Sequence, residues 1–302
     1  MIALMSAPNN LDLRPPRPTN MPSCAKAPKA LREAGLYRRF AELGAVDAGV
    51  VLPGRYADEV TPGALRNQDA IVAHARRLAS RITRLRGEGL APLILGGDCS
   101  LLIAAGLAVR AAGRPCGLIH VDGHTDFRHP GNSATCASLA GEDLAAAVGL
   151  HWPAVADIDR LAPYFPPERT VHIGCRDDDE YQAEVGRVLG QVIPAAAVAG
   201  QGASLAAARA RSVAAGPGSD GYWLHLDVDV LDPAIMPAVD SPSPGGLDAS
   251  QLTGLLAALA PGAVGAQVTV FDPDLDPDGA YAALLTDVLV RGLAGLGTGR
   301  AS

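Results

Sequence analysis

Short apolar runs alternate with longer segments of helical period along most of the chain. No internal repeat with a period of roughly 20 to 50 residues is visible. Helices are predicted at residues 67–86, 101–112, 204–215, 248–260 and 281–293. Eight apolar runs have the length and composition of buried strands, at residues 2–7, 48–52, 92–95, 117–121, 170–174, 191–194, 222–228 and 264–270.

The predicted strands are continuous apolar runs, and the segments between them are long enough for helical crossovers. Both features are typical of an α/β fold with a mostly parallel sheet covered on both faces. No Ser/Gly-rich linker divides the chain, so we expect a single domain over residues 1–302. A Pro-rich stretch with Pro15, Pro16, Pro18 and Pro22 is predicted to be a surface loop. Ligands of such sheets bind at the carboxyl ends of the strands, so polar residues directly after strands are the candidates for chemistry.

Composition narrows the class of protein. The chain is 48% hydrophobic and 19% charged, and it has no apolar run near the roughly 18 residues of a membrane span. The net charge of −7, with no long basic cluster, argues against a nucleic-acid or acidic-membrane partner and suits a small or cationic ligand. The five cysteines are scattered, with no CxxC pair, and the start of the chain lacks the features of a signal peptide. We therefore expect a cytoplasmic protein without a disulfide framework.

Acidic residues follow two of the predicted strands. Asp122, His124 and Asp126 come directly after the strand at 117–121, at alternate positions, so an extended segment directs all three side chains to one side. Asp227 and Asp229 likewise stand at alternate positions, at the end of the predicted strand at 222–228. Four acidic groups that meet at strand ends resist burial unless a cation neutralises them, which predicts a metal site. Oxygen ligands with one imidazole suit Mn²⁺ first, and Fe²⁺, Co²⁺, Ni²⁺ or Zn²⁺ less well.

Each motif has a structural explanation when it is taken alone. Asp and His directly after a strand also act as helix caps and turn formers. A third element, at residues 96–100, follows the strand at 92–95 with the sequence Gly-Gly-Asp-Cys-Ser. Its glycines allow close backbone approach and Ser100 can cap the next helix, so a tight strand-to-helix turn explains it equally well.

Together the three elements resemble the ureohydrolase family, which includes arginase, agmatinase and formimidoylglutamase. The family signatures GGDHS, DxHxD and DVDxLDP are similar to residues 96–100, 122–126 and 227–233. The run at 173–179 is similar to the IGxRDxD motif of arginases. Because the order and spacing cover nearly the whole chain, the protein is identified as a divergent member of this family.

The resemblance implies a three-layer αβα fold around an eight-stranded, mostly parallel sheet. It also implies two Mn²⁺ ions bridged by a hydroxide that attacks a guanidinium or amidine carbon. Asp122 and Asp227 would bridge the ions, Asp126 would bind the first, and His124 and Asp229 the second. Asp126 or a nearby acid would relay a proton to the leaving amine, and Asp126 is the predicted catalytic residue. The implied partners are a small guanidino or amidine substrate and further copies of the chain in a homo-oligomer.

The first ion site departs from the family pattern. Cys99 stands where the family has a histidine ligand, and this softer ligand suits Zn²⁺ or Fe²⁺ better than Mn²⁺. Occupancy of the first site is therefore left open by the sequence, although Cys99 remains a candidate ligand. At least one tightly held ion is expected at Asp122, His124 and Asp229.

Two further family residues are missing. The histidine that arginases carry in the segment corresponding to 131–140 is absent, and Thr135 or Cys136 is predicted to lie near its place. The glutamate that pairs with the substrate guanidinium is also absent, because Thr269 or Val270 occupies its position. Asp272 or Asp274, in the following loop, would be the replacement after a small backbone shift.

The predicted substrate contacts are Arg128, Asn132 and Asp179. Arg128 and Asp179 fall where arginases contact the substrate carboxylate and α-amino group, and an arginine offers a bidentate fork to a carboxylate. The alternative is that Arg and Asp at strand ends pair with each other as structure. His129 is a weaker candidate at the mouth of the site.

The remaining histidines are predicted to be structural. Those at 120, 172 and 225 lie inside predicted strands and are expected to be core residues with satisfied ring nitrogens. His74 and His151 are expected at the surface.

Three functions are compatible with these observations. The first is a metal-dependent hydrolase that cleaves a C–N bond of a linear amidine or guanidino compound. The second is a non-catalytic or regulatory homologue that retains a partial metal site. The third is a single-metal amidohydrolase that acts on acylated amines.

Overall fold

The computed structural model describes residues 1–14, 23–57, 60–113 and 115–299. All eight predicted strands are confirmed, and no strand end differs from its predicted position by more than two residues. The strands are β1 (Ile2–Ala7), β2 (Val46–Val50), β3 (Ala91–Gly96), β4 (Gly117–Val121), β5 (Thr170–Ile173), β6 (Gln191–Ile193), β7 (Tyr222–Asp227) and β8 (Ala263–Thr269). The four residues of the predicted Pro-rich loop lie outside the described residues.

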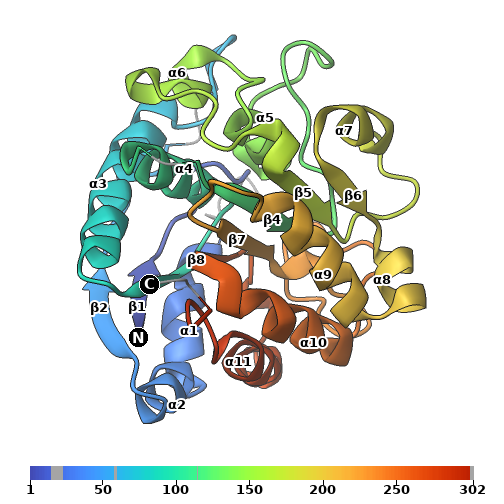
Figure 1. Ribbon diagram of the computed structural model, residues 1–302. Helices are drawn as coiled ribbons and strands as arrows, with labels where there is room; N and C mark the ends of the chain where they lie inside the picture. The colour runs from blue at the N-terminus through green and yellow to red at the C-terminus, as the bar shows by residue number, and fades with distance from the viewer. Residues whose placement is uncertain (15–22, 58–59, 114, 300–302) are drawn as a thin grey trace.

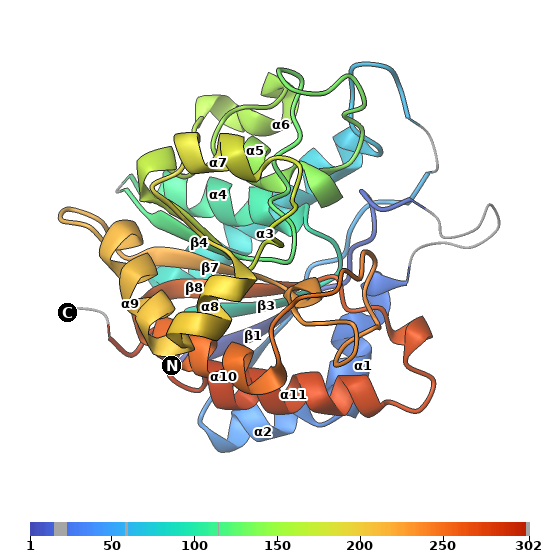
Figure 2. The ribbon, with the colours of Figure 1, turned by 90° about the vertical axis from the view of Figure 1, so that its right-hand side faces the viewer.

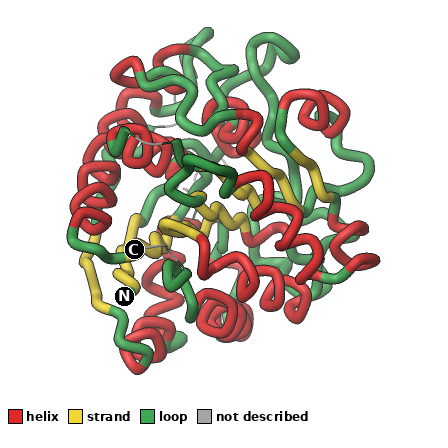
Figure 3. The backbone as a smooth tube through the Cα atoms, viewed as in Figure 1, coloured by secondary structure: helices red, strands yellow, loops and turns green. Residues whose placement is uncertain are grey.

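The strands form one sheet in the order β2-β1-β3-β8-β7-β4-β5-β6 (Figure 1). Every strand pair in it is parallel. The tube in Figure 3 shows that loops and helices connect successive strands, as parallel pairing requires. The predicted α/β class is therefore confirmed.

Helices cover both faces of the sheet and complete three layers (Figure 2). One face carries α3 (Gln68–Gly87), α4 (Leu101–Ala111), α5 (Asp143–Ala147), α6 (Pro153–Ala156) and α7 (Gln182–Val188). The other face carries α1 (Ala27–Glu33), α2 (Leu36–Glu42), α8 (Ala195–Gln201), α9 (Ala203–Ala214), α10 (Ala249–Leu259) and α11 (Ala280–Leu293). The five predicted helices are among them. The other six have seven residues or fewer, which is too short for a helical period to stand out in the sequence.

The hydrophobic core has two parts, one on each face of the sheet. Side chains alternate along each strand, so Trp223 of β7 packs in the part under α3 and α4. Its neighbours Tyr222 and Leu224 pack in the part under α9, α10 and α11. Burial on both faces explains why the inner strands read as continuous apolar runs, whereas the edge strand β2 is largely exposed. Among the described residues, no helix is both long enough and apolar enough to cross a membrane.

Candidate metal centre

The carboxyl ends of the central strands open into one pocket, whose wall includes five of the six predicted ligands. These are Cys99, His124, Asp126, Asp227 and Asp229. The sixth, Asp122, is buried next to them, and its Oδ1 accepts a hydrogen bond from the backbone N–H of His124 at 2.6 Å. The fold therefore brings together the side chains that follow β3, β4 and β7.

The imidazole of His124 lies between a carboxylate and a hydroxyl. Its Nδ1 lies 2.9 Å from Oδ2 of Asp229, and its Nε2 lies 3.0 Å from Oγ of Ser243. Because a carboxylate only accepts, the Nδ1–H of His124 donates to Asp229, and His124 would bind a cation through Nδ1 only when the cation displaces this proton. Ligand atoms of Asp122, His124 and Asp126 all lie within 4.8 Å of one another.

The carboxylates of this group are crowded. Burial, followed by repulsion between neighbouring carboxylates, raises the pKa of Asp122, Asp126 and Asp227 well above the usual range. Burial also acts on Asp229, but the hydrogen bond and the charge of His124 lower the pKa of that carboxyl. Oδ2 of Asp122 is buried and has no hydrogen-bond partner among the described residues. A divalent cation would compensate this repulsion and satisfy the free oxygen, so the residues present fit a metal ion.

Cys99 is part of the same wall and is a neutral thiol in this arrangement. Its Sγ donates to Oδ2 of Asp227 at 3.2 Å. Burial and the charge of Asp227 raise the pKa of the Cys99 thiol well above its usual range. A thiolate ligand would therefore form only when a bound cation displaces the proton.

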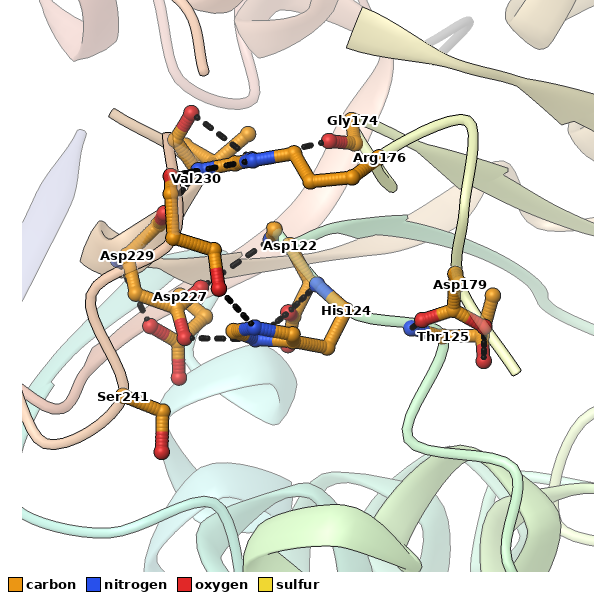
Figure 4. A network of polar contacts seen from close by, with 12 residues as sticks. Asp122, His124, Thr125, Gly174, Arg176, Asp179, Asp227, Asp229, Val230 and Ser241 are labelled. Atoms are coloured by element: carbon orange, nitrogen blue, oxygen red, sulfur yellow. Dashed lines mark hydrogen bonds and ion pairs between the residues drawn. The ribbon is translucent and has the colours of Figure 1, made fainter. Parts of the chain in front are cut away.

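Arg176, from the predicted motif at 173–179, fixes the loops around the pocket. Its buried guanidinium donates to the carbonyls of Gly174 at 3.1 Å, Asp229 at 3.0 Å and Ser243 at 2.6 Å. Figure 4 shows it beside the segment that follows β7. Because these donors are used on backbone carbonyls, Arg176 holds the loops of Asp229 and Ser243 in place.

Two of the predicted substrate contacts, Arg128 and Asp179, line the pocket. They differ in the polar contacts that their side chains already make within the protein. Arg128 is about one-third exposed and has a long ion pair, 3.8 Å, with Glu142. The Asp179 carboxylate accepts from the N–H of Thr125 at 2.9 Å and from its hydroxyl at 2.6 Å (Figure 4). Asp179 therefore fastens the ligand-bearing segment after β4, and its substrate role stays a prediction.

The structure places Asn132 and His129 away from the pocket wall. The Asn132 amide donates to the carbonyl of Phe127 at 3.0 Å and to Glu184 at 2.9 Å. His129 contacts the same carboxylate, with Nε2 at 3.1 Å from Oε1 of Glu184. Both side chains thus shape the loop after β4, and neither is in contact with the pocket.

The predicted replacements for the missing glutamate do not lie where we expected them. Asp272 accepts a hydrogen bond from Ser23, and Asp274 forms an ion pair with Lys26 at 2.6 Å. Neither lines the pocket, whereas Val270 does. The 3₁₀ turn at Pro273–Leu275 directs both carboxylates to the segment around Ser23 and Lys26, so the expected backbone shift is absent.

Thr135 and Cys136, one of which was predicted to lie near the place of the missing histidine, also do not line the pocket. Ala140 and Gly141 do, a few residues further along the chain. The Cys136 thiol donates instead to the carbonyl of Ser133. This part of the chain therefore contributes Ala140 and Gly141 to the pocket wall, and neither residue can carry a proton.

A buried polar row lies behind the centre, and the sequence reasoning missed its chemistry. His172, His120, His225 and Gln267 are in register on β5, β4, β7 and β8. The three histidines are fully buried, but each has an Nε2 without a hydrogen-bond partner among the described residues, so the expected satisfaction of their rings is wrong. Four polar residues at one register position of neighbouring strands were the available signal.

The proton positions of this row follow from a chain of hydrogen bonds. Trp223 Nε1–H, which can only donate, bonds to Oε1 of Gln267 at 3.0 Å. The amide nitrogen of Gln267 therefore donates to Nδ1 of His225 at 2.8 Å, and the neutral His225 ring carries its hydrogen on Nε2. His225, His120 and Asp143 offer atoms within 4.8 Å of one another, but a protonated Nε2 is a donor, not a metal ligand. Asp143 instead faces His225 and His120, and His120 Nε2 lies 3.7 Å from Asp122.

The expectation for His74 and His151 is also wrong, because both are buried. His74 Nε2 lies 3.2 Å from the carbonyl of Val51. His151 accepts from the N–H of Trp152 at Nδ1, at 2.9 Å, which leaves its Nε2–H to donate to Glu142 at 2.8 Å. Cys136, Glu142 and His151 also offer atoms close together, but the same tautomer argument makes His151 a donor.

Residues 2–294 match the sequence profile of the arginase family. The arginase of Bacillus caldovelox is 30% identical over 224 residues, which cover 73% of this chain and 75% of that protein. The N(omega)-hydroxy-L-arginine amidinohydrolase of Streptomyces lavendulae is 31% identical over 215 residues, or 69% and 71% of the two chains. The native structure of the B. caldovelox arginase superposes with a TM-score of 0.85 at 27% identity, over 97% of this chain and 98% of that one.

Proposed function

The chain belongs to the arginase family of hydrolases acting on C–N bonds of amidines and guanidino compounds, and on that premise we propose a divalent-metal-dependent reaction for it. Its substrate is a small linear guanidino or amidine compound. The observation that carries the proposal is the buried Oδ2 of Asp122, which has no hydrogen-bond partner among the described residues and lies among crowded carboxylates. The single sheet that holds all eight strands supports one catalytic domain.

The residues that would hold the metal are Asp122, His124, Asp126, Asp227 and Asp229, together with Cys99. A divalent ion bound there lowers the pKa of water and so supplies a nucleophile at neutral pH. The oxygen-rich set favours Mn²⁺ next to His124 and Asp229, whereas a site that includes Cys99 favours Zn²⁺ or Fe²⁺.

The chain's own groups supply the rest of the chemistry. Asp126 lines the pocket and is the carboxyl group placed to hold a proton for the departing amine. Arg128 offers a guanidinium at the pocket wall to a carboxylate on the substrate. Ser243 and Arg176 keep His124 and the segment of Asp229 in position, which preserves the ligand arrangement between turnovers.

The proposed function is tested by assaying the purified chain with a panel of guanidino, amidine and acylated amine compounds. Parallel samples are loaded with Mn²⁺, Ni²⁺, Zn²⁺ or Fe²⁺. We expect urea or amine release from at least one guanidino or amidine compound and only with metal present. Hydrolysis of acylated amines alone would favour a single-metal amidohydrolase, and silence across the panel would favour a non-catalytic homologue.

Cys99→His is expected to change the metal preference of the first site. A neutral imidazole binds a metal ion directly, whereas the buried thiol of Cys99 must first lose its proton. Imidazole also suits Mn²⁺ better than sulfur does. Equilibrium dialysis should show bound Mn²⁺ rising from about one to about two ions per chain. The matched control is Cys136→His, outside the pocket wall, which should leave the stoichiometry unchanged. Equal stoichiometry in wild type and Cys99→His would contradict the assignment of Cys99 to the first site.

A further inference from the structure

Asp240 brings a carboxylate to the pocket that the predicted metal ligands do not include. It lines the pocket wall and is exposed to its interior. Its carboxylate accepts one hydrogen bond among the described residues, a long one of 3.3 Å from the hydroxyl of the adjacent Ser241. Asp178 and Glu180 also line the pocket, but they belong to the segment after β5. Asp240 follows β7, and Figure 4 shows the next residue, Ser241, on the same side of the site as Asp227 and Asp229.

Backbone pairing places Asp240 next to the end of β8. Val239 forms an antiparallel bridge with Phe271, and the N–H of Asp272 donates to the carbonyl of Ala238 at 2.8 Å. In this register, residue 240 lies opposite residue 270. The apolar end of β8 and the acidic residue across from it therefore share one wall of the pocket.

Val270 is itself held in an unusual conformation. Its φ is 69°, in the left-handed region that a β-branched residue rarely adopts, and its N–H donates to the carbonyl of Gly97 at 2.8 Å. Strain of this kind persists only where the surrounding structure enforces it, which is common at binding sites. The backbone at 270 is thus fixed against the segment before Cys99, while its side chain contributes no charge.

The charges around Asp240 favour a cationic ligand. Burial in the pocket, together with the nearby carboxylates of Asp229 and Asp272, raises the pKa of Asp240. The hydroxyl of Ser241 donates to it and the charge of His124 acts on it from further away, whereas Arg128 lies against Gly141 and Glu142. A carboxylate with spare acceptor capacity next to other carboxylates binds a planar cation strongly, because each N–H donates a charge-assisted hydrogen bond.

We propose that Asp240 is the residue that binds the guanidinium or amidinium cation of the substrate, in the place that Val270 leaves without charge. The inference rests on the proposed function for the identity of the substrate class. Its physical content is independent of turnover: the pocket has an affinity for an alkylguanidinium ion that depends on the Asp240 carboxylate. Neutral compounds of the same shape lack the charge that this contact uses.

The test is a calorimetric titration of Mn²⁺-loaded chain with butylguanidinium and with neutral butylurea. Asp240→Asn should weaken butylguanidinium binding by roughly tenfold to a hundredfold and leave butylurea binding within about threefold. Asp240→Glu, which keeps the charge, should recover part of the loss. Asp178→Asn removes one charge from the same pocket and should change butylguanidinium binding by less than about threefold.

The outcomes separate this inference from the proposed function. Equal butylguanidinium affinity in wild type and Asp240→Asn overturns the role of Asp240, even when the wild type hydrolyses guanidino compounds. Similar losses in Asp240→Asn and Asp178→Asn also overturn it, because they would reflect the net charge of the pocket. Loss of binding confined to Asp240→Asn supports it, even in a chain that shows no turnover with any metal. Bound Mn²⁺, measured in each variant, should be unchanged.

Discussion

Asp122→Asn is expected to abolish tight metal binding and to reduce hydrolysis by on the order of a thousandfold or more. Asp122 is fully buried, and its Oδ2 accepts no hydrogen bond from the described residues. An amide has no negative charge to attract a cation, and its nitrogen would face the ion as a poor ligand. The measurements are metal content by elemental analysis and initial rates at saturating Mn²⁺.

A stability measurement distinguishes metal loss from unfolding. In chelator, Asp122→Asn should unfold at a temperature equal to or higher than that of the wild type, because a buried charge repelled by Asp126, Asp227 and Asp229 is gone. On addition of Mn²⁺ at about 100 times its dissociation constant, the wild type should gain about 2.7 kcal/mol and the variant almost nothing. Asp177→Asn, an exposed acid outside the pocket wall, is the control and should respond like the wild type. An Asp122→Asn chain that keeps its metal and its rate would contradict the proposed centre.

The grouping of the proposed metal ligands could be predicted from the sequence because their placement depends on local rules. Asp122, His124 and Asp126 directly follow a strand, and parallel strands bring their carboxyl ends to one edge. The strands were recognisable because burial on both faces makes them continuous apolar runs. Asp227 meets Asp122 because β7 pairs with β4, and this adjacency was not part of the sequence prediction.

The groups that escaped prediction depend on contacts between distant segments. Asp240 reaches the pocket through an antiparallel bridge between a long loop and the end of β8. The hydrophobic periodicity of the sequence does not predict such a bridge. The Asp272 and Asp274 carboxylates are drawn away by Ser23 and Lys26, about 250 positions earlier in the chain. The tautomer of His225 follows from its hydrogen bond to Gln267 and from the bond between Gln267 and Trp223. Such bonds can be inferred only when the register of the strands is known.

Two backbone segments lie close together at Gly97, where the chain after β3 passes the chain after β1. An ideal Cβ on Gly97 would lie 1.6 Å from the carbonyl oxygen of Asn9 and 2.7 Å from its nitrogen. The segments cannot separate freely, because Ala7 of β1 is in register with Gly96 of β3. Asn9 also donates from its amide to Asp98 at 2.7 Å and to Ser100 at 2.6 Å. A side chain at 97 must therefore displace a fixed and hydrogen-bonded backbone.

Gly97→Ala is consequently expected to lower the free energy of unfolding by at least about 3 kcal/mol, measured by urea denaturation in chelator. The matched control is Gly186→Ala in α7, where, apart from the adjacent residues and the backbone of the helix itself, no described atom lies within 4 Å of the added Cβ. Alanine has the higher helix propensity, so this control should be unchanged or more stable by up to about 1 kcal/mol. Because Cys99 follows two residues later, Mn²⁺ or Zn²⁺ binding to the folded Gly97→Ala chain should weaken as well. A Gly97→Ala protein with the unfolding midpoint of the wild type would show that the segment of Asn9 yields easily, and that this turn does not hold Cys99 against the carboxylates.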